Sequence, residues 1–186
     1  MKRIMDTKPR KLYHGSQYKI TEGVIRVKPA YCNHMTTKVT AVFATPDVVH
    51  AGLYAIMRLV ALGIAMPRTR DTLYIQKLNP NIPEKAYVYE LDSVGFERDA
   101  DGNYFSLTDK PIKDVIEIDI MQEIRKNNLK VYILKNKIDF LNMSKDEFKR
   151  LVEQQIVGDK DNFVLYNPDA KNLDMMIVTN AMQSEK

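Results

Sequence analysis

The stretch Leu12-Tyr13-His14-Gly15-Ser16 is the most informative part of this chain for its fold. An apolar pair followed by Gly15-Ser16 predicts a short strand over residues 12–14 that ends in a turn. A histidine at the end of a strand, next to a glycine, is placed to point into a cleft where the backbone stays open to a ligand. The competing interpretation is that the ring of His14 only caps the turn.

A second strand and a long helix follow this pentad. Residues Thr40 to Ala44 are β-prone and alternate little, which predicts a buried strand. Thr45-Pro46-Asp47 then supplies a helix N-cap, a proline for the first helical position and an acid for the first turn. We expect this helix to run to about Met66. Because nearly every face of it is apolar, we expect it to be packed on more than one side.

Most of the remaining elements up to residue 120 are predicted strands. They are expected at Leu73 to Leu78, Tyr87 to Leu91, Val94 to Phe96, Tyr104 to Leu107 and Val115 to Ile120, with hairpin chemistry at Asp99 to Asn103. One helix among about six strands, without regular alternation, predicts an α+β fold with a largely antiparallel or split sheet.

The segment after residue 120 has a different character. A short helix is expected at 121–128, a strand at 129–134, and a helix from Ser144 to Val157 that the capping-box pair Ser144 and Glu147 begins and Gly158 ends. We therefore expect a domain at 1–120 and, packed on it, an α/β extension at 121–186 that forms a C-terminal helical extension of the fold.

Composition limits the classes of function. A chain of 186 residues with 45% hydrophobic content can bury one sizeable core. The formal charge of +4 permits nucleic acid as a partner without requiring it, and basic residues gather in the first 28 positions. The single cysteine, Cys32, excludes an intramolecular disulfide and favours a reducing, cytoplasmic setting. The apolar run from Val48 to Met66 contains His50 and Arg58, so we interpret it as a buried helix and expect no membrane partner.

Several common sites are excluded by motif. Seven glycines do not assemble into a dinucleotide fingerprint or a nucleotide-triphosphate loop. The histidines His14, His34 and His50 lack helical metal-ligand spacing, and Cys32 has no second pair, so we expect no metal.

Phe43 and Tyr54 complete a spaced set with the pentad. The strand Val42-Phe43-Ala44-Thr45 is followed by a helix in which Tyr54 lies eleven positions after Phe43. Together with His14-Gly15-Ser16, this pattern resembles the ADP-ribosyltransferase superfamily, both the poly-ADP-ribose polymerase catalytic domain and the bacterial rifampicin ADP-ribosyltransferases. The resemblance covers about residues 11–120 and implies an ADP-ribosyltransferase-like split, mostly antiparallel sheet around a central cleft.

The resemblance also implies a role for each matching residue, with NAD as the substrate. His14 would hydrogen-bond the adenosine-side ribose, the backbone of Gly15 would read the nicotinamide carboxamide, and Ser16 would lie beside them. Phe43 and Tyr54 would sandwich the nicotinamide ring, and each stacked aromatic pair adds about 0.5–1.5 kcal/mol beyond burial. His14 and Tyr54 are thus expected in the catalytic set.

Two positions depart from the family pattern. Ala51 stands where the polymerase type has a serine that helps hold the carboxamide. Asn103 stands where that type has a catalytic glutamate, and it cannot supply a negative charge. Asp101, two residues away, is our expected replacement, while Asp99 and Glu97 are near enough in the sequence to substitute.

These residues favour a mono-ADP-ribosyltransferase-like protein that binds NAD and transfers ADP-ribose to an unknown acceptor, with release of nicotinamide. The acceptor class, whether protein, nucleic acid or small molecule, stays open. One alternative is a catalytically inactive module that binds NAD, ADP-ribose or nucleic acid. Another is an interaction protein that acts through the segment from Ser144 onward.

Overall fold

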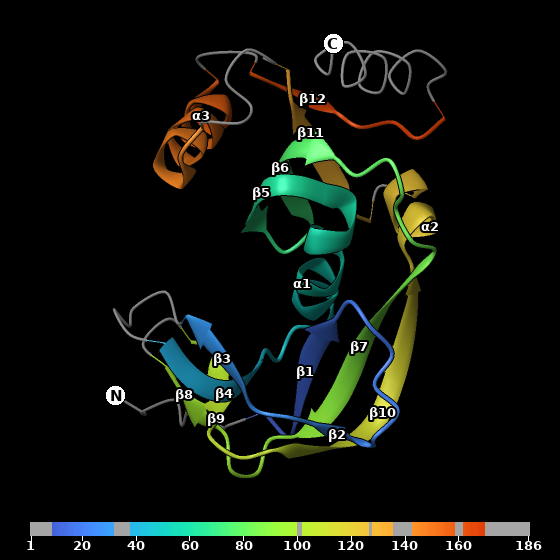
Figure 1. Ribbon diagram of the computed structural model, residues 1–186, viewed down its shortest axis with the longest axis vertical. Helices are drawn as coiled ribbons and strands as arrows, with labels where there is room; N and C mark the ends of the chain where they lie inside the picture. Colours follow the sequence, from blue (N-terminus) through green and yellow to red (C-terminus); the bar gives the residue numbers. More distant parts are fainter. Residues whose placement is uncertain are drawn as a thin grey trace, which may run out of the picture.

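The computed structural model shows a mixed α+β protein whose sheets are mostly antiparallel (Figure 1). The structure describes residues 9–31, 38–99, 102–126, 128–135, 143–158 and 162–169. Within these ranges the chain forms three helices and twelve strands, arranged as three four-stranded sheets. The predicted α+β class is confirmed.

The first sheet carries the pentad on one edge. Its order is β1-β7-β10-β2, and its strands are β1 (Lys11–Ser16), β7 (Lys85–Asp92), β10 (Lys110–Asp119) and β2 (Val24–Ile25). All neighbours are antiparallel, and His14 lies opposite Tyr89 on β7. The strands expected at 12–14, 87–91 and 115–120 fall in β1, β7 and β10. Two details were wrong: Gly15 and Ser16, expected as a turn, continue β1 opposite Val88 and Tyr87, and Ile120 begins a helix instead of ending β10.

The second sheet joins residues from both halves of the chain. Its order is β12-β11-β6-β5, and its strands are β12 (Phe163–Leu165), β11 (Lys130–Leu134), β6 (Thr72–Leu78) and β5 (Ala61–Thr69). β11 runs parallel to β6, with Lys130 opposite Thr72. The expected domain boundary near residue 120 stays a prediction. Strand β11, which follows residue 120, belongs to the same sheet as β5 and β6, which precede it.

The third sheet lies beside the first. Its order is β3-β4-β9-β8, and its strands are β3 (Lys28–Tyr31), β4 (Lys38–Ala44), β9 (Tyr104–Ser106) and β8 (Glu97–Arg98). The hairpin expected around residues 99–103 is present, but its first strand is β8 rather than Val94 to Phe96. The backbone N–H of Phe96 bonds the carbonyl of Ser93 in a turn, and this takes residues 94–96 out of the ladder.

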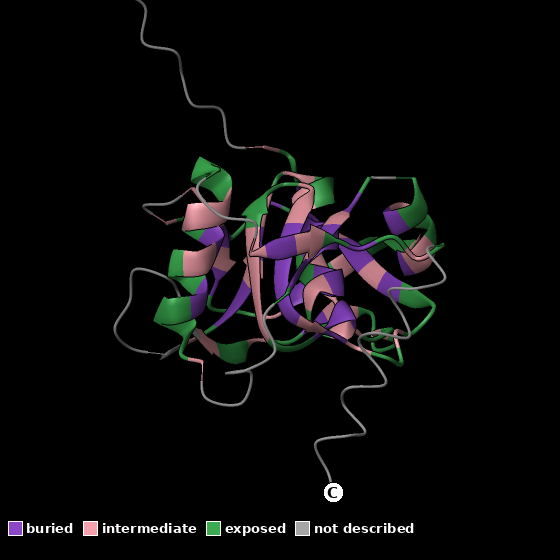
Figure 2. Ribbon diagram, turned by 90° about the horizontal axis from the view of Figure 1, so that it is seen from above, coloured by how far each residue is buried: buried purple, intermediate pink, exposed green. Residues whose placement is uncertain are grey.

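Helix α1 (Val48–Val60) occupies the centre of the fold, between the second sheet and the first (Figure 1). Leu53, Ile56 and Val60 pack in one core with the second sheet. On another side Gly52 lies against the first sheet, where an added Cβ would stand 3.1 Å from Cδ1 of Ile118. Packing of α1 on more than one side is confirmed, and buried positions concentrate around it (Figure 2).

Strand β6 is buried on both faces. Leu73 and Ile75 face the core that contains α1, whereas Tyr74 packs in a separate cluster with helix α3 (Lys145–Val157). In that cluster Phe148 of α3 is fully buried. A strand covered by a helix on each face is typical of parallel sheets, and β6 does pair in parallel with β11, although its other neighbour, β5, is antiparallel.

The two predicted boundaries of α1 are wrong. Its N-cap is Asp47 rather than Thr45, because Oδ1 of Asp47 accepts hydrogen bonds from the backbone N–H groups of Val49 and His50 at 2.9 and 3.3 Å. The helix ends at Val60 rather than near Met66. There Asn79 Nδ2 donates to the Leu59 carbonyl and the Asn79 N–H to the Val60 carbonyl, each at 2.8 Å, which caps the helix.

The residues after Val60 form β5 instead of further helical turns. The backbone at Ala61 is extended, with φ −110° and ψ 137°. Gly63 then takes a left-handed φ of 79°, and the next N–H, of Ile64, donates to Oε1 of the buried Gln76 at 3.0 Å. Pairing with β6 therefore decides the conformation of this apolar run.

The predicted helix signals after residue 120 are confirmed. Helix α2 (Ile120–Arg125) begins at the N-cap Asp119. At α3, Ser144 and Glu147 form the expected capping box, and Gly158 closes the helix with φ 85°. On α3, Phe148 and Val152 are buried, while Ile156 is exposed. In the part of the chain described above, no helix is long and apolar enough to cross a membrane.

Gly15 lies where β1 crosses α1 most closely. A Cβ built on Gly15 would overlap the carbonyl oxygen of Ala51 and stand 2.8 Å from the backbone nitrogen of Ala55. Both neighbours are helix backbone, which cannot rotate away as a side chain can. Glycine is thus required for the strand and the helix to approach this closely.

We predict that Gly15→Ala lowers the free energy of unfolding by at least about 2 kcal/mol, because the added methyl group forces β1 and α1 apart. Urea denaturation followed by circular dichroism measures the change. Gly52→Ala is the matched control. Its new methyl group stands 3.1 Å from the tip of the Ile118 side chain and 4.0 Å from a methyl group of Val88, both side-chain atoms, and alanine is the better helix former, so this variant should keep or gain stability. Equal stability of the two variants would contradict the steric role of Gly15.

Candidate functional site

A cavity of about 620 Å³ opens where β1, β4 and α1 meet. Its volume lies within the usual range for sites that bind small molecules and cofactors. Backbone and side chains from the two neighbouring sheets and from α1 form its walls. The lining residues used below are Tyr13, His14, Gly15, Ser16, Tyr18, Lys28, Phe43, Tyr54, Arg58, Asp99 and Asn103.

The structure brings most of the predicted site residues together around this cavity. His14, Gly15, Ser16, Phe43, Tyr54 and Asn103 all line it, although they come from four separate parts of the chain. Asp101 lies outside the described residues. Asp99, which we considered as its substitute, lines the cavity, whereas Glu97 is exposed on β8 and is absent from the lining.

A pair of backbone hydrogen bonds holds the two sheets together beside the cavity. The N–H of Tyr13 donates to the carbonyl of Thr45 at 2.7 Å, and the N–H of Thr45 donates to the carbonyl of Tyr13 at 2.9 Å. This single antiparallel bridge ties the middle of β1 to the end of β4. His14 directly follows Tyr13, and Phe43 lies two positions before Thr45. The bridge therefore fixes the relative position of His14 and Phe43.

The ring of His14 is oriented by the strand opposite. Its Nδ1 lies 2.7 Å from the carbonyl oxygen of Phe43. Because a carbonyl only accepts, Nδ1 carries the proton, and Nε2 is left as the acceptor of the neutral ring. Burial lowers the pKa of His14, the Phe43 carbonyl opposes this, and the charge of Lys28 lowers the pKa further. At neutral pH His14 is uncharged and offers Nε2 to a hydroxyl donor.

Ser16 and Gly15 have structural roles that need no ligand. The hydroxyl of Ser16 donates to the carbonyl of Tyr18 at 2.9 Å and accepts from the Tyr18 N–H at 3.2 Å, which stabilises the turn after β1. Gly15 is required by the crossing with α1. These two positions thus shape the wall of the cavity, whatever the cavity binds.

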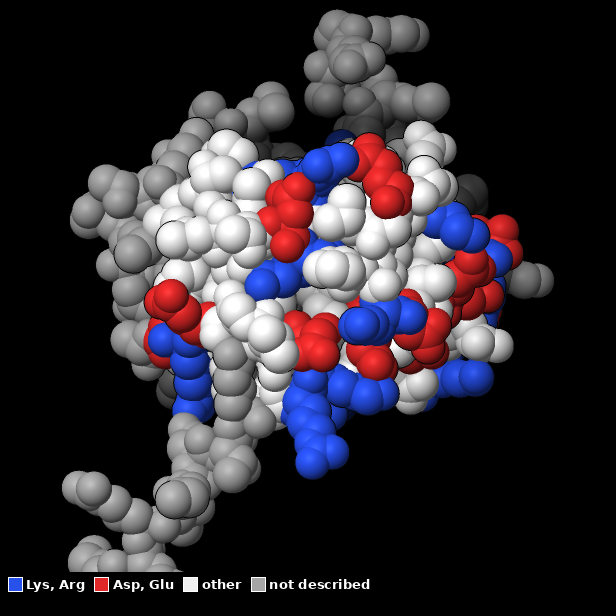
Figure 3. Space-filling view, turned by 90° about the horizontal axis from the view of Figure 1, so that it is seen from below, with Lys and Arg blue, Asp and Glu red and all other residues white. Residues whose placement is uncertain are grey.

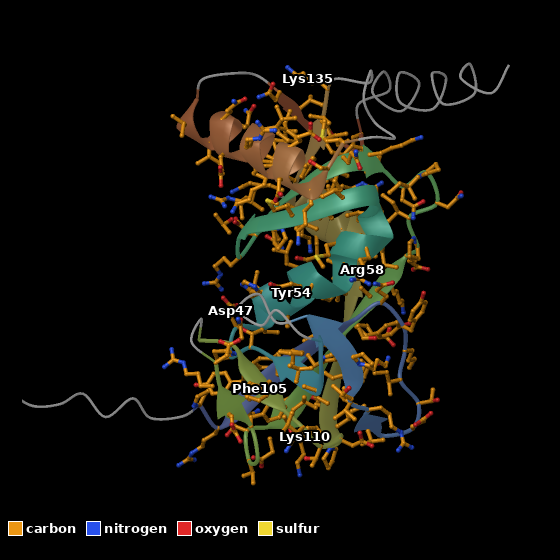
Figure 4. The ribbon with its side chains drawn as sticks, turned by 60° about the vertical axis from the view of Figure 1, so that its left-hand side comes forward. Asp47, Tyr54, Arg58, Phe105, Lys110 and Lys135 are labelled. Carbon is orange, nitrogen blue, oxygen red and sulfur yellow. The ribbon has the colours of Figure 1, made fainter. Side chains whose placement is uncertain are left out.

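Aromatic rings line the cavity on two sides. Phe43 is half-buried and has its ring centroid 6.4 Å from that of Phe105 on β9. Tyr54 is 42% exposed, and its ring lies 5.0 Å from the ring of His50 one turn earlier. Figure 4 shows Tyr54 on α1, above the strands that carry Phe105. Partial burial raises the pKa of the Tyr54 hydroxyl, so this residue stays a neutral hydrogen-bond donor.

Asn103 is held by Asp99 across the hairpin. The Asn103 backbone N–H donates to Oδ1 of Asp99 at 2.8 Å, and the Asn103 side-chain amide donates to Oδ2 at 3.4 Å. Further backbone bonds link Asp99 to Asn103 and Gly102. The position that the family pattern gives to a glutamate is therefore occupied by an amide that orients the nearby carboxylate of Asp99.

Sequence reasoning missed four lining residues that bear on ligand chemistry: Tyr13, Tyr18, Lys28 and Arg58. Arg58 follows Tyr54 by four positions on the same helix, and residues at this spacing share a helix face, so this residue was within reach of prediction. Lys28 had no such signal. Its approach to the cavity depends on β3 pairing with β4, at a register set by the tertiary fold.

Three basic residues in the described part of the N-terminal segment pair with acids. Lys11 pairs with Glu90 at 2.8 Å, Lys19 with Glu117 at 3.2 Å, and Arg26 with both Glu22 and Asp109 at 3.0 and 3.1 Å. On the face seen from below, basic and acidic side chains are intermixed (Figure 3).

The described residues contain no group of three or more His, Cys, Asp or Glu side chains that is arranged to hold a metal ion. In comparisons with known protein families, curated proteins and solved structures, nothing matches this chain.

We predict that His14 makes stability depend on pH. Its pKa is lower in the folded state than the ordinary value of 6.5. The unfolded chain therefore binds the extra proton as the pH falls below about 6.5, and stability that is present above this pH is lost on acidification. Urea unfolding of the wild type and of His14→Asn should be compared at about pH 7.5 and 5. Asparagine retains a donor for the Phe43 carbonyl but does not titrate, so the variant should lose less stability on acidification. Parallel pH profiles would rule out a depressed pKa at His14.

Proposed function

We propose that this protein binds NAD in the cavity and acts as a mono-ADP-ribosyltransferase-like enzyme on an unidentified acceptor. The observation that carries the proposal is the meeting of His14, Phe43, Tyr54 and a carboxylate, that of Asp99, around one cavity. The sequence resemblance expects these four kinds of group together. The mixed α+β fold with mostly antiparallel sheets supports the proposal as well.

The chemistry of the lining is suited to the two ends of NAD. Phe43 and Tyr54 offer ring faces to a flat, electron-poor nicotinamide. His14 is neutral and presents an acceptor nitrogen, which is what a ribose hydroxyl requires from a partner. The tyrosine hydroxyls can donate to carbonyl or phosphate oxygens.

The proposed reaction breaks the bond between the ribosyl C1′ carbon and the nicotinamide nitrogen. The electron pair of that bond leaves with neutral nicotinamide, and positive charge develops on the ribosyl ring. Asp99 would stabilise this charge, because a fixed carboxylate in a cavity interacts strongly with a cation formed beside it. The acceptor nucleophile then bonds to C1′ and loses its proton to solvent.

The ion pairs of Lys11, Lys19 and Arg26 weigh against nucleic acid as the principal ligand. Binding to a phosphate backbone requires cations that are available to replace the counterions of the nucleic acid. The binding-module alternative, in which NAD or ADP-ribose binds without turnover, shares this cavity and differs only in whether nicotinamide is released.

We predict that the protein releases nicotinamide from NAD and that His14→Ala and Tyr54→Ala each lower the rate by about a hundredfold or more, a loss typical for a residue that positions or stabilises the reacting group. Nicotinamide is quantified by chromatography, and ADP-ribose binding by calorimetry. Circular dichroism checks that the variants are folded. Release that is unaffected by both substitutions contradicts the enzyme hypothesis. Binding of NAD without any release favours the inactive module.

We further predict that Asp99→Asn abolishes nicotinamide release while Asp101→Asn retains most of it, because Asp99 is the described carboxylate that lines the cavity. Both substitutions remove one negative charge from the same hairpin, so each is the control for the other. A loss confined to Asp101→Asn instead assigns the acid to the residue favoured by the sequence alone. Full activity in both variants excludes a carboxylate of this hairpin from the reaction.

A further inference from the structure

Two cations line the cavity in addition to the residues discussed above. Lys28 comes from β3 and Arg58 from α1, and both residues are exposed. Among the described residues that line the cavity, Asp99 is the one acid and His14 is neutral at pH 7, so the formal charge of these residues is +1. The cavity is therefore suited to an anionic ligand.

Lys28 and Arg58 differ from the neighbouring basic residues in their ion pairing. Lys11, Lys19 and Arg26, which do not line the cavity, each pair with at least one carboxylate. Among the described residues, neither Lys28 nor Arg58 has a carboxylate within ion-pair distance. Their charges remain available, and they are directed at the same cavity from different elements.

The position of Arg58 relative to Tyr54 sets the direction in which an anion would lie. The two residues are four positions apart on α1, on the same face, which places their Cα atoms about 6 Å apart along the helix axis. Figure 4 shows both side chains extending from this helix. A ligand whose flat ring stacks on Tyr54 would continue along the helix toward Arg58. The next group of such a ligand then meets a guanidinium rather than a hydrophobic wall.

We propose that Lys28 and Arg58 form a subsite for the pyrophosphate group of a dinucleotide. This inference rests on the proposed function, since it assigns the part of NAD that lies between the two nucleosides. The guanidinium of Arg58 has the planar pair of donors that binds phosphate oxygens in a bidentate manner, and Lys28 adds a point charge. The pyrophosphate of NAD carries two negative charges, which two cations would neutralise.

The subsite also defines the class of ligand that the cavity selects. A nucleoside without phosphate would gain only stacking and ribose contacts, and it would leave the two cations without a partner. ADP-ribose and NAD use the whole cavity. The protein should therefore distinguish a pyrophosphate-linked ligand from its nucleoside halves chiefly through Lys28 and Arg58.

The test compares ligand binding by calorimetry for the wild type, Lys28→Gln, Arg58→Gln and the control Lys113→Gln. Lys113 is an exposed residue of β10 outside the cavity lining, so the control removes the same charge elsewhere. The probes are NAD, ADP-ribose, ADP and adenosine. Each cavity variant should weaken ADP-ribose binding about tenfold, as expected for loss of one charged hydrogen bond, and the double variant should weaken it further. Adenosine binding and the control should not change.

The outcomes separate this inference from the proposed function. NAD that binds the cavity variants as tightly as the wild type overturns the subsite and leaves the proposed function standing. ADP that binds in an Arg58-dependent manner, while NAD neither binds nor loses nicotinamide, supports the subsite and overturns the proposed function. If none of the four probes binds the wild type, both are overturned. Unfolding midpoints equal to that of the wild type confirm that the variants report on binding.

Discussion

The close approach of Gly15 to the backbone of α1 is the constraint on which the arrangement of this protein depends. Because no side chain separates β1 from Ala51 and Ala55, the helix sits directly on the strand, and its remaining faces reach both the first and the second sheet. The Tyr13–Thr45 bridge then brings the end of β4 beside the same strand. Two backbone contacts, at Tyr13 and Gly15 of the same strand, thus position the elements that carry His14, Phe43 and Tyr54. A single residue type at position 15 serves both packing and the shape of the cavity.

The cavity combines groups of different electrical character without burying an unpaired charge. Burial keeps His14 neutral while the Phe43 carbonyl orients its ring, the Asp99 carboxylate accepts hydrogen bonds from its own hairpin, and the cations Lys28 and Arg58 are exposed. Each group is oriented by a neighbour in the fold rather than by a ligand. Such preorganisation is what allows a site to act on developing charge without the cost of rearranging its own dipoles.

The sequence predicted those features that local chemistry specifies. The capping box at Ser144 and the strand that contains His14 depend on short-range patterns, and both are present. The end of α1 was mispredicted because its cause is distant: Asn79, nineteen residues beyond Val60, caps the helix, and Gln76 holds the turn at Gly63. An apolar run with no early break cannot show where helix gives way to strand. Lys28 was missed for the same reason, since its place follows from strand pairing.

The parallel pairing of β6 with β11 has a consequence for how the chain folds. Thr72 and Lys130 are opposite each other, so 58 residues must be in place before the first contact of this ladder forms. Contacts of such long sequence separation slow folding, because closing the intervening loop costs conformational entropy before the strand pairing stabilises the chain. During synthesis β6 and the apolar side of α1 emerge well before β11. In that interval the edge of β6 that later pairs with β11 has unpaired backbone groups. The ribosome-bound chain is thus most exposed to misassociation while β6 already exists and β11, which pairs with one of its edges, does not.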